Sequence, residues 1–318
     1  MTPTQLRAFA AIARHGSARE AAEELGVSDA AISSHTAALR RELGDPLYER
    51  SAGGLAFTPG GLRLATRAVE LLGLQDQTRK EVSAAGNGQR ILRLATTSLF
   101  AEYAAPGLLD LFKTRADDLE VEMSVHASDR FADMLVSRQA DVTIAPRRRS
   151  TDHHFTSRDI LKYQLILVVG THHRLRAGRC HPDSLRSQTW LLGPAALEEH
   201  GATADLLSRF AVPEQHQRIF QSHGAAISAV QGGAGIGIVP EFRAREQITN
   251  GTLCRVASVG AEASGVWTAT TLRSDQTPAV VAELMRFITT PRATQAMLSG
   301  SGTNIAHFRP KVHVTLWR

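Results

Sequence analysis

The sequence predicts a two-domain α+β chain, with an all-α N-terminal domain and long connecting helix followed by an α/β domain. Two observations predict this division. Residues 1–85 show helical spacing of apolar side chains with one short glycine-turned hairpin, whereas short apolar runs alternate with helical patterns from Ile91 onward. The 318 residues are 43% hydrophobic and 21% charged, which suffices for two domains with ordinary cores.

A helix-turn-helix is predicted between Gly16 and Arg41. The segment reads GSAREAAEELGVSDAAISSHTAALRR, in which Ser17 and Ser28 are predicted N-caps of two short helices and Gly26 forms the turn between them. Inward stripes are predicted for Ala18, Ala21, Ala22 and Leu25, and for Ile32, Thr36, Leu39 and Leu43. The outward side of the second helix has small side chains and two arginines, which suits a DNA major groove. An αα-hairpin without a DNA role is the alternative that this segment alone leaves open.

Further elements flank this helix pair. The letters TPTQ at residues 2–5 predict the start of a helix that packs on it. Residues 47–57 predict a small β-hairpin wing with Arg50 near its tip. The dipeptide TP at residues 58–59 predicts the start of a helix that continues to about residue 85. Three- and four-residue spacing on this helix predicts a dimerisation seam made of Leu62, Ala65, Val69 and Leu72.

Charge and composition limit the possible partners. The net charge is +5, but residues 1–60 hold six arginines and seven acidic residues, so any attraction to DNA must come from how the arginines are arranged. A capped polar helix at the start and the lack of an apolar run of 18 residues predict a cytoplasmic protein without a membrane partner. Cys180 and Cys254 are isolated and expected to be inert, and adjacent histidines at 153–154 and 172–173 diverge, so we expect no metal and no bound cofactor.

An α/β domain follows the Gly86–Gly88 break. Strands at 91–95, 119–125 and 141–145, with helices at 108–114 and 129–139, predict a βαβαβ unit with a parallel sheet. A second unit is predicted from strands at 164–169, 190–192, near 219 and at 237–240, with a helix within 198–210. The segment GVWTATTL returns the chain to the first unit, where residues 279–288 form a helix. Two α/β lobes joined by two crossover strands are therefore expected.

The N-terminal third shows a longer pattern that matches a known family. It reads LRAFAAIARHGSAREAAEELGVSDAAISSHTAALRRELGDPLYERSAGGLAFTPGG, with the GS turn, the LGVS turn, the RELG exit and the TPG linker start in register. Residues 1 to about 85 thus resemble the winged helix-turn-helix and linker helix of LysR-type transcriptional regulators. The resemblance implies a DNA-binding domain at 1–58, a linker helix and hinge at 59–88, and a periplasmic-binding-protein-like effector domain at 89–298. Lobe I of that domain would comprise about 89–164 and 269–298, lobe II about 165–268, and a C-terminal extension would cover 299–318.

The same resemblance implies a function. Such a protein regulates transcription sequence-specifically, is not an enzyme, and binds a dyad operator in double-stranded DNA as a dimer or tetramer. A small-molecule effector, commonly a carboxylate, would bind between the lobes, and RNA polymerase would be a further partner. The expected DNA-contacting residues are Ser17, Ser28, Asp29, Ala30, Ser33, Ser34, His35, Arg40 and Arg50. Asp29-Ala30 and Ser34-His35 replace the family's usual Gln-Pro and Arg-Gln, and Asp29 is alternatively a helix N-terminal acid favoured by the macrodipole.

Effector contacts are expected at the carboxyl ends of strands, where helix N-termini offer N–H groups that suit an anion. The residues in these positions are Thr96, Thr97, Ser98, Ser128, Ala145, Gly193, Thr203, Ser222 and His223. The alternative for each Ser and Thr is a structural N-cap.

Three segments look functional without fitting a site. GGAGIG at 232–237 follows a predicted helix and precedes a strand, the reverse of a dinucleotide fingerprint, and is expected to be a tight turn. Arginines 147–149 are expected in a solvated loop, and residues 299–318 either are disordered or add an edge strand. An enzyme on a binding-protein-like fold and a nonspecific DNA-compacting protein are the rival functions. The first lacks a nucleophile, base and orienter set, and the second lacks a basic reading domain.

Overall fold

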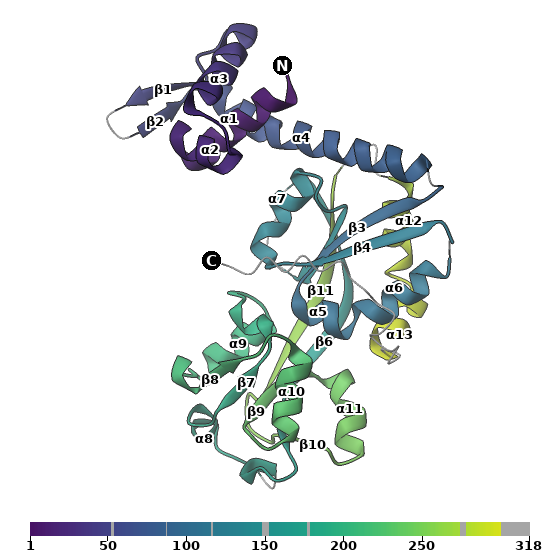
Figure 1. The fold of residues 1–318 in the computed structure, drawn as a ribbon. Helices are drawn as coiled ribbons and strands as arrows, with labels where there is room; N and C mark the ends of the chain where they lie inside the picture. Colours follow the sequence, from purple (N-terminus) through teal and green to yellow (C-terminus); the bar gives the residue numbers. More distant parts are fainter. Residues whose placement is uncertain are drawn as a thin grey trace. The chain divides into compact units, whose positions relative to one another are not determined.

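The computed structural model describes residues 1–51, 54–86, 88–115, 117–147, 153–176, 179–273 and 278–299. The chain divides into two compact units, residues 1–87 with 132–139 and residues 88–131 with 140–318. Each unit has its own fold (Figure 1). Along the described part of the chain, no helix combines the length and apolar character needed to span a bilayer.

Three capped helices form the start of the first unit. They are α1 (Pro3–His15), α2 (Ala18–Leu25) and α3 (Asp29–Leu43). Thr2, Ser17 and Ser28 accept hydrogen bonds from the backbone as N-caps, and each helix ends at a glycine in the left-handed conformation. The predicted inward stripes of α2 and α3 are buried or half-buried except for Leu43, which lies in the last turn of α3 and is 44% exposed.

The wing and the long helix complete this unit. Strands β1 (Tyr48–Ser51) and β2 (Gly54–Phe57) pair antiparallel, as predicted, and α4 runs from Pro59 to Gly86. The Asp45 carboxylate accepts hydrogen bonds from the Leu47 N–H at 2.6 Å and the Thr58 hydroxyl at 2.7 Å, and these bonds lower the pKa of Asp45. A Cβ on Gly61 would lie 1.9 Å from the Leu47 carbonyl oxygen. A glycine is therefore needed at position 61, where the backbone at the start of α4 lies close to the backbone that leads into the wing.

The second unit contains one mixed sheet in the order β4-β3-β5-β11-β6-β9-β7-β8, with β10 paired to β6. Strands β3, β4 and β5 are parallel, as are β8, β7 and β9, whereas β6 and β11 run antiparallel to their neighbours and connect the two lobes. The predicted two-lobed α/β architecture is confirmed (Figure 1). The strands are β3 (Arg90–Thr96), β4 (Leu119–Val125), β5 (Val142–Pro146), β6 (Phe155–Gly170), β7 (Trp190–Leu192), β8 (Gln217–Ile219), β9 (Ile236–Pro240), β10 (Leu253–Arg255) and β11 (Glu262–Leu272).

Helices cover both lobes. Those of lobe I are α5 (Ser98–Tyr103), α6 (Ala105–Lys113), α12 (Ala279–Phe287) and α13 (Pro291–Ser299). Helix α7 (Phe131–Val136) lies almost entirely in the segment 132–139 that groups with the first unit. Those of lobe II are α8 (Pro182–Arg186), α9 (Ala202–Arg209), α10 (His223–Gln231) and α11 (Glu241–Thr249). Short 3-10 turns occupy Ser128–Arg130, Arg174–Arg176, Pro194–Leu197 and Glu214–His216.

Several boundaries differ from those predicted. The first crossover strand was expected at 164–169, but β6 begins nine residues earlier, at Phe155. The additional residues pair with β11, and the sequence did not indicate them because they do not form a continuous apolar run. The helix expected at 129–139 is a 3-10 turn followed by α7, and the helices α5 and α13 were not expected at all. The glycine-rich turn at 232–237 is confirmed, since Gly233 has φ +82° between α10 and β9. The 300–318 part of the C-terminal extension lies outside the described residues.

Aromatic side chains pack where the two lobes join. Trp267 of β11 is fully buried, stacks on Tyr163 of β6 at 4.0 Å and meets Phe100 of α5 edge-on at 5.2 Å. The register of β11 shifts directly after Trp267. A Cβ on Gly265 would lie 2.3 Å from the Tyr163 ring, so a glycine is needed for this ring to sit on the strand. The crossover strands are thus fixed to α5 by rings rather than by hydrogen bonds alone.

Candidate DNA-binding surface and sensor site

Helix α3 presents a surface of short side chains. Asp29, Ala30, Ser33 and Ser34 are exposed, and His35 is half-buried. Ile32, Thr36 and Leu39 of the same helix are buried and pack inward. A helix without bulky outward side chains can approach base edges closely, and the serines and Asp29 supply donors and acceptors.

Two predicted contact residues have capping roles. Ser17 accepts from the Glu20 N–H at 3.3 Å and Ser28 from the Ala31 N–H at 3.2 Å. Ser17 thus fixes the start of α2 and Ser28 the start of α3.

Arg40 has a structural partner that the sequence did not indicate. Its guanidinium donates to the Tyr48 carbonyl oxygen at 3.0 Å and lies over the Tyr48 ring, 4.3 Å from the centroid. The Arg40 side chain thus connects α3 to the wing, so its replacement would also remove a structural contact. Arg50 pairs through its backbone with Leu55, and its side chain lies outside the described residues.

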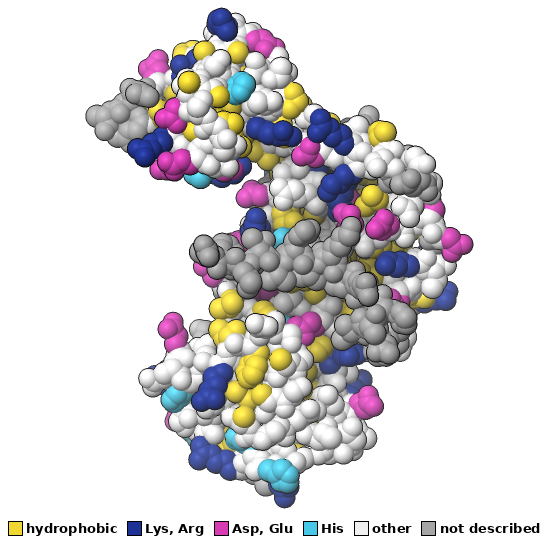
Figure 2. All heavy atoms as spheres, viewed as in Figure 1, with side chains coloured by type: hydrophobic (Ala, Val, Ile, Leu, Met, Phe, Trp, Pro, Cys, Tyr) yellow, Lys and Arg dark blue, Asp and Glu magenta, His cyan; other side chains and the backbone are white. Residues whose placement is uncertain are grey.

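Acidic neighbours offset much of the positive charge of this unit. Arg14 pairs with Glu24 at 2.6 Å and Arg19 with Glu23 at 3.3 Å. Basic and acidic side chains are interspersed over the face of α1–α4 seen in Figure 2. Within the described part of α1–α3, Arg41 is exposed and has no acidic partner. Arg41 is therefore better placed than Arg40 to meet a phosphate.

The predicted seam on α4 faces α1 for the most part. Ala65 packs with the cluster of Phe9, and Val69 and Leu72 pack with that of Leu6. Leu62 is 59% exposed. A second stripe of large apolar side chains on α4 is open to solvent and consists of Leu71, Leu74 and Val82.

In the second unit, α5 of lobe I contacts the N-terminus of α10 of lobe II. The Glu102 carboxylate accepts from the backbone N–H groups of His223 at 2.8 Å and Gly224 at 3.0 Å. The Ser98 hydroxyl lies 3.2 Å from His223 Nε2, and the Tyr103 ring lies 5.7 Å from the imidazole. We call these residues the α5–α10 contact.

Burial sets the ionisation of this contact. It lowers the pKa of His223 to about 4, so the imidazole is neutral at pH 7. It also raises the pKa of Glu102, which the two N–H donors partly offset. A Cβ on Gly193 would lie 2.2 Å from His223 Nδ1, so the loop after β7 closes over the other side of the ring.

A cavity of about 690 Å³ lies beside the crossover strands. Its lining includes Pro146, Arg147, Lys162, Tyr163, Gly201, Ala202, Asp205, Phe242 and Gly265. Nearby, burial and then the charge of Asp129 raise the pKa of Glu198 to about 7. Asp129 belongs to lobe I and Glu198 to lobe II, so two carboxyl groups approach each other where the lobes meet.

Family comparison decides the assignment. The LysR substrate binding domain matches residues 85–291, and the bacterial regulatory helix-turn-helix protein, lysR family, matches residues 3–62. The chain belongs to the LysR family of transcriptional regulators. The HTH-type transcriptional regulator Rv0377 of Mycobacterium tuberculosis is 50% identical over 320 residues, which cover 100% of both chains.

Solved structures show the same LysR fold. ArgP from Mycobacterium tuberculosis superposes with a TM-score of 0.59 and 17% identity, covering 90% of this chain and 97% of that one. Full-length CbnR complexed with its target DNA gives a TM-score of 0.53 and 22% identity, covering 91% and 100%. At these identities the likeness establishes the fold of the LysR regulator and not its ligand.

The structure of this LysR regulator separates the predicted effector residues into groups. Ser98, Gly193 and His223 meet at the α5–α10 contact. Thr96 donates to the Ile144 carbonyl at 2.8 Å, and Ser222 caps α10 by accepting from the Ala225 N–H at 3.1 Å, so both have structural roles. Elsewhere, Ser128 begins a 3-10 turn, Ala145 pairs with Thr268 in the sheet, Thr203 lies in α9, and Thr97 is buried with an unpartnered hydroxyl.

Glu102, Tyr103 and Glu198 were missed as site residues. Helix α5 is only six residues long and ends at Tyr103, three residues before Pro106, so its apolar spacing gave too short a pattern to predict a helix. Among the arginines at 147–149, Arg147 is exposed and pairs with Asp159 at 3.2 Å, and the next two lie outside the described residues.

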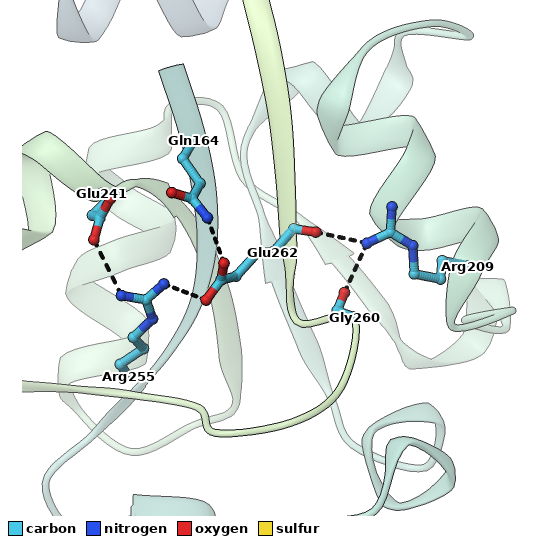
Figure 3. Close-up of polar contacts among 6 residues, drawn as sticks. All are labelled: Gln164, Arg209, Glu241, Arg255, Gly260 and Glu262. Atoms are coloured by element: carbon cyan, nitrogen blue, oxygen red, sulfur yellow. Dashed lines mark hydrogen bonds and ion pairs between the residues drawn. The ribbon is translucent and has the colours of Figure 1, made fainter. Parts of the chain in front are cut away.

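A network of polar contacts fixes the start of β11 within lobe II (Figure 3). The Glu262 carboxylate accepts from Gln164 of β6 and from Arg255 of β10, and Arg255 also contacts Glu241 at 3.1 Å. Arg209 of α9 donates to the carbonyl oxygens of Gly260 and Glu262 at 2.9 and 2.6 Å. Four elements of lobe II thus hold the crossover strand before it enters the hinge.

Proposed function

We propose that this LysR regulator binds a dyad operator sequence-specifically as a dimer and that a small anionic effector, bound between the lobes of its sensor domain, controls this binding. The observation that carries the DNA-binding part is α3, whose exposed face consists of short polar and small side chains beside Arg41. By analogy with the family, we further propose that this regulator acts in the cytoplasm, with RNA polymerase as a partner.

The dimer part rests on α4. Because Ala65, Val69 and Leu72 already pack within the chain, we assign pairing to the exposed stripe of Leu71 and Leu74, continued by Val82. Exposed apolar side chains in a row on a long helix favour burial against a second copy. Pairing of two chains would place two α3 helices on one dyad site, and contacts between sensor domains would extend the dimer to a tetramer.

The effector part rests on unsatisfied donors. Within the described residues, the Thr97 hydroxyl, the Tyr103 hydroxyl and the Trp267 indole N–H are buried without a hydrogen-bond partner. Buried polar groups are normally satisfied. A ligand that accepts hydrogen bonds, such as a carboxylate, would satisfy donors of this kind.

Fluorescence anisotropy with the full chain tests the proposal. The protein is titrated with DNA flanking its own gene and with a shuffled fragment, over a range of salt concentrations. We expect selectivity on the order of a thousandfold for the operator, and Ser33→Ala should reduce it without changing thermal stability. Equal affinity for operator fragments recovered by genome-wide selection and for shuffled DNA would overturn it.

A further inference from the structure

Side chains occupy the backbone N–H groups of the first three residues of α10. The first N–H groups of a helix lack partners inside the helix. In α10 these belong to His223, Gly224 and Ala225, of which the Ser222 hydroxyl takes the third. The first two are both taken by the Glu102 carboxylate. A negative group from the other lobe therefore lies where a free anion would bind.

Glu102 is held in this position by the rest of α5. Leu99, Phe100 and Tyr103 are buried, with Phe100 against Trp267 of the hinge and Tyr103 against His223. The Arg243 guanidinium of α11 lies over the Tyr103 ring, 6.0 Å from its centroid. The carboxylate thus comes from a packed helix and not from a loose surface side chain.

We propose that Glu102 excludes free anions from the N-terminus of α10 and joins lobe I to lobe II there. This inference deepens the proposed effector function and rests on it. Because the Glu102 carboxylate already occupies the N–H groups at this N-terminus, a carboxylate effector binds to other donors, such as the Thr97 and Tyr103 hydroxyls, while Glu102 remains in place. Glu102 is then a specificity-determining residue of the sensor.

Hydrogen–deuterium exchange of the full chain, without DNA or effector, tests this. Peptides covering residues 220–226 report the His223 and Gly224 amides. In Glu102→Ala we expect these amides to exchange about tenfold faster or more, because each loses its charge-assisted hydrogen bond. Glu102→Gln keeps one acceptor oxygen, so only one of the two amides should lose protection. Glu246→Ala removes an exposed carboxylate from α11 and should leave this segment unchanged.

Acetate then serves as the anion probe, against chloride at equal ionic strength. It should slow the exchange of these amides in Glu102→Ala, where the N-terminus is vacant, and should not affect the wild type. Unchanged exchange in Glu102→Ala, equal protection by acetate in the wild type, or no protection in the variant would each overturn the proposal. None of these readouts involves DNA, so their failure is distinguishable from a failure of operator binding.

Discussion

Replacing Arg40 and Arg41 separately distinguishes a structural arginine from a phosphate-binding one. The two residues are adjacent at the end of α3, but Arg40 is bound to Tyr48 and Arg41 is exposed without an acidic partner among the described residues. We expect Arg40→Ala to destabilise the DNA-binding unit, and Arg41→Ala to weaken DNA binding without loss of stability.

The expected size of the first effect follows from the contacts that are lost. A hydrogen bond to a charged group contributes about 1.5–3 kcal/mol and an exposed cation–π contact about 0.5–1 kcal/mol. Arg40 as a whole is half-buried, so solvent reduces both, and we expect a net loss of about 1–2 kcal/mol. For a small domain, each kcal/mol lowers Tm by about 4–8 °C.

Arg41→Ala should alter the free energy of unfolding by no more than about 0.5 kcal/mol. If Arg41 meets one phosphate, the slope of log affinity against log salt should fall by about 0.9. Calorimetry and anisotropy titrations at several salt concentrations measure the two quantities. Equal Tm for Arg40→Ala and the wild type, or a loss of Tm in Arg41→Ala as large as in Arg40→Ala, would refute this division of roles.

Three further substitutions test the sensor domain and α4. Gly193→Ala places a Cβ 2.2 Å from His223 Nδ1 and should lower the free energy of unfolding in urea by about 1–3 kcal/mol. Gly224→Ala is the control, because its Cβ meets nothing closer than 3.9 Å. Equal losses in the two variants would contradict the close packing at Gly193. Burial raises the pKa of Glu198 from 4.5 to about 7, so the folded protein keeps a proton that the unfolded chain releases, and this group lowers stability as pH rises through that window. Glu198→Gln should therefore gain stability over the wild type as pH rises from about 4.5 to about 7, and a difference independent of pH would argue against a buried carboxyl. Leu74→Glu, at a side chain 50% exposed, should shift the dimer towards monomer in light scattering without unfolding it, and an unchanged mass would remove this stripe from the interface.

Much of the DNA-binding unit could be predicted because its signals are local. The Thr2, Ser17 and Ser28 caps act on N–H groups two or three residues away, and the glycine stops need only their own backbone conformation. The exposed face of α3 follows from the same periodicity. The dimerisation seam on α4 stays a prediction, since spacing alone does not tell whether an apolar stripe packs on its own chain or on a partner, and Ala65, Val69 and Leu72 pack within the chain.

The candidate sensor site could be predicted only in part. The α/β pattern predicted that residues directly after the strands lie near one another, and Ser98 and Gly193 do lie next to His223. Glu102 was missed because its partners are more than a hundred residues away in sequence. No local pattern distinguishes a carboxylate that takes two distant N–H groups from one that faces water.

By itself, the sequence determined the LysR family, the two-domain layout and the capped helices of the first unit with their wing, since caps, turns and apolar periodicity act over a few residues. Only the tertiary structure decided that Arg40 is bound to the wing, which face of α4 is free, and that Glu102 occupies the α10 N-terminus. Each of these depends on groups far apart in the chain, whose meeting is set by how the elements pack.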